Sequence, residues 1–295
     1  MKITPLPEAQ PKPGRRVAIG TFDGVHLGHR EVIGDNDTVL TFEPHPLAVV
    51  RPDALPKLLC PPGVKADLIA GLGVEELVTI PFDRDFASKT PEQFVQEVLV
   101  DRLGAERVSV GENFRFGKKQ AGDADFLGSR PEFETRVVPL VEVDGEIVSS
   151  SHIRGLVAAG EVDKAAHFLG GPFLFEGVVV EGDRRGRELG MPTANIVPDD
   201  RFATPGHGVY AAWAHGYPAA VNVGVRPTFD TARGLLVETH LLDFDGDLYG
   251  QTLRVAFLER MRGEKRFESV DDLVAQMRLD VDRAREIASA TVPRR

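Results

Sequence analysis

The chain has 295 residues, of which 42% are hydrophobic and 27% are charged. That length predicts about two domains, at roughly 100–200 residues per domain, and the composition suits two apolar cores. The formal net charge of −10 argues against a nucleic-acid-binding surface, but a few local arginines would suffice to bind small anionic ligands.

The single cysteine, Cys60, excludes an internal disulfide and favours a reducing compartment. The N-terminal residues lack the apolar stretch of a signal peptide, and no run approaches the ~18 apolar residues of a membrane span. We therefore expect a cytoplasmic protein with no membrane partner.

Residues 17 to about 168 alternate short apolar runs with helical patterns, and this alternation predicts a doubly wound parallel sheet. Helical spacing in Gly63–Leu72 and Thr90–Leu103 predicts crossover helices, the second capped by Thr90 and begun by Pro91. The proline-rich first thirteen residues are the one low-complexity segment, and the sequence shows no internal repeat. The expected buried strands are Val17–Thr21, Val39–Phe42, Leu77–Ile80, Val108–Val110 and Val137–Leu140.

A glycine-bounded turn follows the first of these strands and reads GTFDGVHLGH from Gly20 to His29. His26 and His29 are three positions apart, so they would lie on one face of a helical turn. Two imidazoles at the N-terminus of a helix can hold phosphate oxygens. The alternative hypothesis is a tight turn whose histidines are solvent-exposed.

Polar residues mark two further places in the first half. Asn113 and Arg115 follow a predicted strand and could face a ligand, because ligands of such sheets bind at the carboxyl ends of the strands. Residues 149–151 are three serines at the start of a helical pattern, and Arg154 adds a cation. The serines alone could be no more than a helix cap, but Arg154 beside them favours phosphate binding.

After Gly170 the pattern changes to strands rich in valine and aromatic residues, separated by Gly, Pro and Asp turns, which predicts an antiparallel barrel. We therefore place the domain boundary there, with domains of residues 1–169 and 170–295. The expected strands are Phe175–Glu181, Gly208–His215, Ala219–Val223, Leu235–Phe244 and Leu253–Leu258. A helix capped by Ser269 closes the chain. Its apolar stripe consists of Val270, Leu273, Val274, Met277, Val281 and Ala284.

The string from Gly186 to Asn195 suits a flexible loop over phosphates, because glycines flank a basic segment. Thr193 and Asn195 offer two neutral oxygen ligands for a hard cation such as Mg²⁺. The alternative is a turn with an Asx cap.

Glu238 is the most informative residue of the second half. In the strand Leu235–Phe244 it shares a face with apolar side chains, which is costly for a carboxylate without a partner or a task. One hypothesis is a general base that takes a proton from a primary hydroxyl. The other is a glutamate at the edge of the sheet.

Taken together, these motifs resemble the bacterial bifunctional riboflavin kinase/FAD synthetase family, from about residue 15 to residue 290. The resemblance implies an N-terminal nucleotidyltransferase domain that adenylylates FMN to FAD and releases pyrophosphate. It also implies a C-terminal barrel that phosphorylates riboflavin to FMN with ATP. The implied partners are therefore riboflavin, FMN and ATP, with Mg²⁺ as cofactor and a monomer or weak homo-oligomer as the working form.

The resemblance further implies residue roles. His26 and His29 would stabilise charge on the ATP phosphates, and Glu238 would activate the hydroxyl of riboflavin, with Thr193 and Asn195 holding Mg²⁺–ATP. The residues implied to shape the adenylyltransferase site are Gly20, Phe22, Asp23, Asn113, Ser149, Ser150, Ser151 and Arg154. Those implied to bind ATP or flavin in the kinase are Arg184, Gly186, Arg187, Gly190, Thr193, Asn195 and Arg226.

The sequence departs from the family at the first crossover. Only Arg30–Asp37 lies between the histidine turn and the next strand, which leaves room for about two helical turns. An alternative is therefore a riboflavin kinase with a degenerate adenylyltransferase domain. A flavin-nucleotide-binding protein without turnover is a third hypothesis, disfavoured because Glu238 and both histidines are present.

Overall fold

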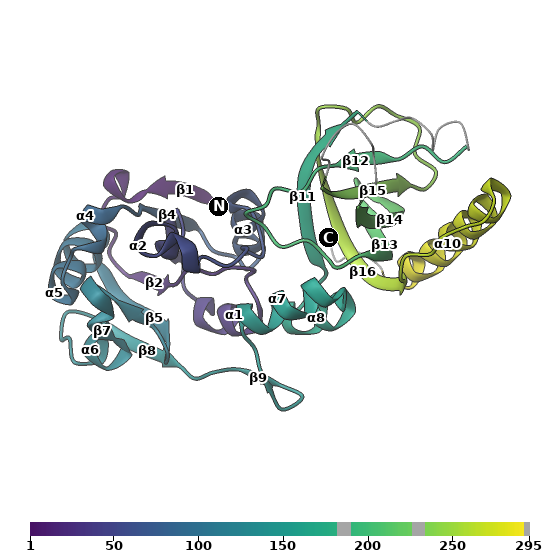
Figure 1. The fold of residues 1–295 in the computed structure, drawn as a ribbon. Helices are drawn as coiled ribbons and strands as arrows, with labels where there is room; N and C mark the ends of the chain where they lie inside the picture. The colour runs from purple at the N-terminus through teal and green to yellow at the C-terminus, as the bar shows by residue number, and fades with distance from the viewer. Residues whose placement is uncertain (182–189, 226–233, 292–295) are drawn as a thin grey trace. The chain divides into compact units, whose positions relative to one another are not determined.

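The structure, a computed structural model, describes residues 1–181, 190–225 and 234–291. It contains two compact units (Figure 1). The first unit consists of residues 1–56 and 62–149, and the barrel unit consists of residues 57–61 and 150–295. No helix in the described part of the chain is long and apolar enough to cross a membrane.

The first unit is built on a six-stranded sheet in the order β1-β4-β3-β2-β5-β8, and every neighbouring pair is parallel. The predicted parallel sheet is thus confirmed. Because all strands run the same way, their carboxyl ends lie along one edge of the sheet. The strands are β1 (Lys2–Pro5), β2 (Arg15–Ile19), β3 (Thr38–Glu43), β4 (Glu76–Pro81), β5 (Ala105–Gly111) and β8 (Glu134–Val138).

Both faces of this sheet are covered, as expected of a doubly wound fold. Val17 and Ile19 of β2 belong to one buried cluster, whereas Ala18 between them belongs to another. The helices are α1 (Leu27–Ile33), α2 (Pro46–Val50), α3 (Pro62–Ala70), α4 (Arg84–Ala87), α5 (Pro91–Gln93) and α6 (Ala124–Gly128). The π-helix η3 (Phe94–Leu103) continues α5, and the predicted cap of Thr90 is a capping box with Gln93.

Three-residue 3₁₀ turns and two-stranded ladders complete the first unit. The turns are η1 (Leu6–Glu8), η2 (Pro52–Ala54) and η4 (Lys118–Gln120). The ladders pair β6 (Arg115–Phe116) with β7 (Gly122–Asp123), and β9 (Glu142–Val143) with β10 (Glu146–Ile147).

The first thirteen residues, which the sequence presents as a low-complexity segment, contain a strand of the sheet. β1 pairs with β4 at the edge of the sheet, and the buried Thr4 donates a hydrogen bond of 2.6 Å to Glu76 Oε1. The strand has four residues and only one buried side chain, so it shows no periodicity. Pro5 is tolerated because an edge strand has a side that needs no N–H donor.

The short first crossover is long enough to connect β2 with its parallel neighbour β3. α1 has seven residues, about the two turns predicted, and Val17 of β2 pairs in parallel with Thr38 of β3. The amide of Asn36 donates to the carbonyls of Val32 and Ile33 at 3.2 and 2.7 Å, which satisfies the end of the helix. The reduced length therefore leaves the sheet intact.

The barrel unit is a closed antiparallel barrel in the order β11-β12-β15-β14-β13-β16 (Figure 1). The predicted barrel is confirmed, but β12 was not predicted, because three residues are too few to show a pattern. β15 is also shorter than predicted, so Leu242 and Phe244 lie beyond the row that contains Glu238. The strands are β11 (Phe173–Val180), β12 (Ala194–Ile196), β13 (Gly208–Ala214), β14 (Tyr217–Val225), β15 (Leu235–Leu241) and β16 (Thr252–Arg262).

The closing helix α10 (Val270–Ala290) packs on β13, β14 and β16. Ser269 caps it as predicted, by accepting a hydrogen bond from the backbone N–H of Asp272. The predicted stripe is wrong at Val270, which is 62% exposed, because the barrel does not cover the first helical residue. Asp280, which the apolar pattern did not predict, is buried instead.

Two helices precede the barrel in the chain and pack with it. α7 (Ser150–Ala159) contacts α8 (Val162–Leu169), and α8 contacts β16 and β11. The compact units divide at residue 149, and the domain boundary near residue 170, expected from the change of sequence pattern, stays a prediction. Residues 57–61, with the buried Cys60, also belong to the barrel unit through hydrogen bonds of Leu58 with Arg201 and Ala203.

Gly206 lies in close backbone contact with the C-terminal end of α7. Its N–H donates to Val157 O at 3.0 Å, and a Cβ there would lie 2.5 Å from Ala158 O. We expect Gly206→Ala to destabilise the barrel unit by about 1–3 kcal/mol, because backbone must move to admit the methyl group. Urea denaturation measures this, with Gly171→Ala as control, since a Cβ at Gly171 meets nothing within 4 Å. Equal stability of the two variants would contradict the packing described.

Candidate functional sites

The turn after β2 has a strained backbone. Phe22 and Val25 are buried and have positive φ angles of 49° and 45°, which are unusual for residues other than glycine. Gly20 leaves room for this ring, because a Cβ there would lie 3.0 Å from the ring of Phe22 and would force it to shift. Strain of this kind persists only where the surroundings enforce it, and it clusters at ligand-binding sites. Asp23, also predicted for this site, is 7% exposed.

The two histidines of the turn stack on one another. The ring centroids of His26 and His29 are 3.5 Å apart with an interplanar angle of 14°, and the ring of Phe22 meets His29 edge-on at 5.4 Å. Nδ1 of His26 accepts a hydrogen bond of 3.2 Å from the backbone N–H of His29 and so caps α1. The alternative of two solvent-exposed histidines is wrong, because His26 is only 6% exposed.

The environment of His29 favours its neutral form. Burial lowers the pKa of His29 well below its usual value of 6.5, and the nearby His26 and Lys65 lower it further. Its Nδ1 is buried and has no hydrogen-bond partner among the described residues. At pH 7 the pair therefore contains a neutral imidazole with a polar atom that a ligand could satisfy.

Polar residues from neighbouring elements lie at the same edge of the sheet. Asn113 is exposed two residues after β5, and β5 is the neighbour of β2. Lys65 of α3 was not predicted as a site residue. Its Nζ lies 3.4 Å from the carbonyl oxygen of Thr21 and 3.5 Å from Oγ1 of Thr41. A single lysine in a helical pattern gives no signal in a sequence, so only the fold could reveal it.

The serine-rich segment begins a helix, as predicted. α7 starts at Ser150, and Arg154 donates a hydrogen bond of 3.1 Å to Oγ of Ser151. Ser149 belongs to the first unit and the other three residues to the barrel unit. Their meeting with the histidine turn therefore stays a prediction.

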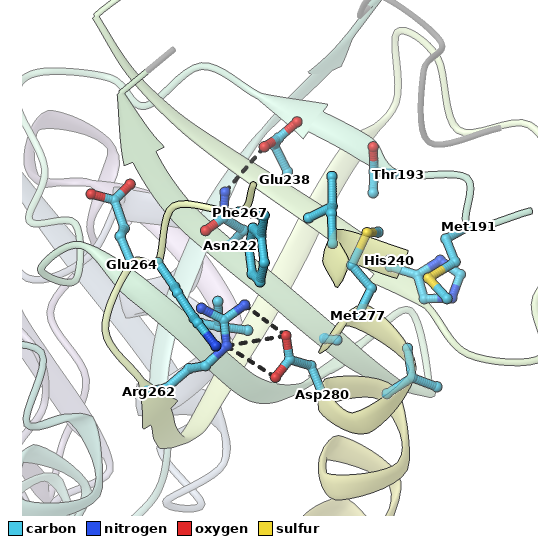
Figure 2. A pocket seen from close by; sticks show the side chains of 15 residues that line it. Met191, Thr193, Asn222, Glu238, His240, Arg262, Glu264, Phe267, Met277 and Asp280 are labelled. Carbon is cyan, nitrogen blue, oxygen red and sulfur yellow. Dashed lines mark hydrogen bonds and ion pairs between the residues drawn. The ribbon is translucent and has the colours of Figure 1, made fainter. Parts of the chain in front are cut away.

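A cavity of about 360 Å³ lies between the outer face of the barrel and α10 (Figure 2). β14 and β15 line one side and α10 lines the other. The residues that line it are Met191, Thr193, Val209, Ala220, Asn222, Glu238, His240, Arg262, Glu264, Lys265, Phe267, Leu273, Met277, Asp280 and Val281. It thus joins apolar walls to a small number of polar groups, as small-molecule sites do.

Glu238 lies in this cavity between two asparagines. It pairs across the sheet with Asn195 of β12 on one side and Asn222 of β14 on the other. Asn222 Nδ2 donates a hydrogen bond of 3.1 Å to Oε2 of Glu238 (Figure 2). The alternative of a glutamate at the edge of the sheet is wrong, because β15 has a neighbour on each side.

Thr193 and Asn195 lie close to this carboxylate. Thr193 lines the same cavity, and Asn195 Nδ2 donates a hydrogen bond of 3.3 Å to the carbonyl of Thr193. Oδ1 of Asn195 is buried and has no hydrogen-bond partner among the described residues. The alternative of an Asx-capped turn is wrong, because Asn195 lies within β12. The structure therefore brings together the three residues predicted for the kinase.

Two family models match the chain: that of FAD synthetase over residues 8–152 and that of riboflavin kinase over residues 169–288. A bifunctional riboflavin kinase/FMN adenylyltransferase of Pseudomonas fluorescens is 36% identical over 293 residues, covering 94% of each chain. That of Escherichia coli K12 is also 36% identical and covers 96% of each chain. The chain belongs to this family.

The likeness extends to a solved structure. A macrolide-efflux protein from Streptococcus pneumoniae matches with a TM-score of 0.84 and 31% identity, covering 97% of this chain and 99% of that one. The fold of that structure is therefore shared over nearly the whole chain.

The sequence motifs did not predict the polar residues that shape this cavity away from Glu238, Thr193 and Asn195. Arg262 donates to both carboxylate oxygens of the buried Asp280, from Nε at 3.0 and 3.2 Å and from Nη2 at 2.8 Å. Gln276 Nε2 donates to the same carboxylate at 3.0 Å. The available signal was a charged residue at a stripe position of the closing helix. His240 was also missed, and its Nδ1 lies 2.7 Å from the carbonyl of Pro192.

Some predicted site residues cannot be placed. Arg184, Gly186, Arg187 and Arg226 lie outside the described residues. Gly190 is exposed and has a φ angle of 76°, a conformation that favours glycine.

The lowered pKa of His29 predicts a loss of stability in acid. In the unfolded chain the imidazole of His29 binds a proton at about pH 6.5, whereas in the folded protein it binds one only at a lower pH. The free energy of unfolding therefore falls as the pH drops below about 6.5. One such proton contributes up to about 1.4 kcal/mol per pH unit. We expect His29→Gln to remove this contribution between pH 7 and pH 5, measured by urea denaturation followed through amide exchange of β2 and β3.

The control is His215→Gln, which changes an exposed histidine of the barrel. It should leave the pH dependence of the first unit unchanged. An identical acid slope in the wild type and His29→Gln would show that the environment of this ring is not as described.

Proposed function

We propose that the first unit adenylylates FMN at the histidine turn and that the barrel unit phosphorylates riboflavin at Glu238. One observation carries this proposal. Each unit has its own polar cluster, one with stacked imidazoles and the other with a carboxylate beside neutral oxygen atoms. The two matched family models have the same order along the chain.

In the proposed kinase reaction, Glu238 accepts the proton of the primary hydroxyl of riboflavin. The hydroxyl oxygen then attacks the γ-phosphorus of ATP, and ADP leaves. Asn222 holds the carboxylate in one orientation through its hydrogen bond. Positioning and charge neutralisation carry most of the rate in phosphoryl transfer, so the base contributes the smaller share.

Thr193 and Asn195 would hold Mg²⁺ in the kinase site. The fit rests on the donor set, because hydroxyl and amide oxygens are hard ligands of the kind that Mg²⁺ accepts. It also rests on the buried Oδ1 of Asn195, an acceptor that no described residue satisfies. When bound, the ion neutralises charge on the β- and γ-phosphates of ATP.

In the proposed adenylyltransferase reaction, a phosphate oxygen of FMN attacks the α-phosphorus of ATP and pyrophosphate leaves. His26 and His29 donate hydrogen bonds to the phosphates and stabilise the charge that develops. Asn113, Ser149, Ser150, Ser151 and Arg154 are proposed to position the triphosphate or the FMN phosphate. Gly20, Phe22 and Asp23 are proposed to shape the turn.

The alternative of a degenerate adenylyltransferase is not favoured. The short α1 still joins two paired parallel strands, and the FAD synthetase model matches residues 8–152. The residues proposed to bind ATP or flavin in the kinase are Arg184, Gly186, Arg187, Gly190 and Arg226. We further propose that the enzyme acts in the cytoplasm, where ATP is available to both reactions.

The two-site proposal predicts separable losses. Glu238→Gln should lower riboflavin phosphorylation by about 10²-fold or more, while FMN-to-FAD conversion persists. His29→Ala should lower FAD formation by about 10²–10³-fold and leave the kinase intact. Both are measured by chromatography of the flavins after incubation with ATP and Mg²⁺, starting from riboflavin or FMN. If either change affected both activities equally in a folded protein, the assignment of one site per unit would be wrong.

The proposed metal site predicts a selective Mg²⁺ requirement. Asn195→Leu should raise the Mg²⁺ concentration for half-maximal kinase rate by roughly tenfold or more, since even outer-shell partners of a metal contribute that much. The Mg²⁺ dependence of FAD formation in the same chain is the internal control. A kinase that loses rate at every Mg²⁺ concentration, with an unchanged half-maximal value, would argue against Asn195 as a ligand.

A further inference from the structure

Lys65 of α3 lies over the ends of two adjacent strands. Its Nζ contacts the carbonyl oxygen of Thr21, just past β2, at 3.4 Å and Oγ1 of Thr41 in β3 at 3.5 Å. The hydroxyl of the buried Thr41 in turn donates to the same carbonyl of Thr21 at 3.2 Å. The lysine is therefore tied to the start of the histidine turn.

Within the part of the chain that the structure describes, the polar atoms near Nζ of Lys65 are neutral oxygens at the long end of the hydrogen-bond range. No ion pair of Lys65 occurs among residues 1–181, 190–225 and 234–291, although other lysines of the first unit have one. Lys2, Lys12 and Lys89 pair with Glu76, Glu75 and Glu97. A half-buried ammonium without a carboxylate is suited to an anion that arrives from solution.

Lys65 is also close enough to the histidine pair for its charge to act on His29. Like-charged neighbours would oppose one another if both groups were cationic, and the neutral state of His29 avoids this. The site thus combines one full positive charge with two imidazoles. That combination fits a polyanion better than a neutral ligand.

We propose that Lys65 binds the polyphosphate of ATP in the adenylyltransferase site, and with it the pyrophosphate that leaves. This inference rests on the proposed function of the histidine turn. In the sheet order β3-β2-β5, Lys65 reaches the turn from the side of β3, while Asn113 follows β5 on the other side. The phosphate chain is held between these two flanks.

The alternative is a structural role, in which Lys65 only ties α3 to the turn through Thr21 and Thr41. Such a role predicts a loss of stability when Lys65 is replaced, but no selective loss of affinity for anions. The two roles are therefore distinguishable by binding of inorganic pyrophosphate.

The experiment titrates the full-length protein with pyrophosphate and Mg²⁺ while the imidazole resonances of His29 are followed by NMR. We expect a response of His29 in the wild type and at least tenfold weaker binding in Lys65→Met, because a charge-assisted hydrogen bond is lost. Lys65→Arg should retain most of the affinity. Lys89→Met is the matched control, since it removes an equal charge that is paired with Glu97.

The outcomes separate the two proposals. No response of His29 in the wild type would overturn the proposed function of the turn, and the role of Lys65 with it. A response with equal affinity in Lys65→Met and the wild type would overturn the role of Lys65 alone.

In steady state, Lys65→Met should raise the KM for ATP in FAD formation by tenfold or more and leave riboflavin phosphorylation unchanged.

A second measurement on the unaltered protein covers the case in which Lys65→Met does not fold. Acetic anhydride labels accessible amines, and mass spectrometry quantifies the labelling at each lysine. Saturating pyrophosphate with Mg²⁺ should protect Lys65 and leave Lys89 unchanged. Unchanged labelling of Lys65 at a concentration that shifts His29 would refute the proposal.

Discussion

Strand pairing across β12, β15 and β14 gives the barrel its site. The register puts Asn195, Glu238 and Asn222 in one row on three adjacent strands. Paired residues of antiparallel strands project to the same face, so a slip of one residue would replace Glu238 by Val237 or Thr239, both of which are fully buried. The hydrogen bonds of the barrel backbone therefore decide that a carboxylate faces the cavity under α10.

In the first unit, parallel strand pairing brings the candidate site residues together. β3, β2 and β5 are adjacent, so the segments that follow them meet at one edge of the sheet. The turn after β2 must then place two imidazoles within a few residues, and it does so at the cost of positive φ angles at Phe22 and Val25. Both side chains are buried, and the apolar core they join stabilises a backbone that would otherwise relax.

The sequence allowed the larger elements to be predicted because each buries a long apolar run or stripe. β1 and β12 were missed, since strands of four and three residues give no periodic pattern. The motif residues Glu238, Thr193 and Asn195 were found through their residue types. Lys65 could not be found, because it acts through Thr21, which only folding brings near. Asp280 left a signal as a charged residue in the apolar stripe, but its partner Arg262 comes near only in the fold.

Net charge is a poor guide to the ligands of this protein. The chain carries a formal charge of −10, yet its proposed substrates include a polyphosphate in each unit. Whether a given cation can bind an anion depends on whether a nearby carboxylate already neutralises it. In the barrel unit Arg262 is held by Asp280, so the charge of that arginine is largely neutralised within the protein. At the histidine turn, burial keeps one imidazole neutral beside an ammonium that no described carboxylate neutralises. A neutral imidazole can donate a hydrogen bond to a phosphate without the desolvation cost of a second buried cation. The turn can therefore be both enclosed and attractive to an anion, which a pair of charged histidines could not achieve at the same burial.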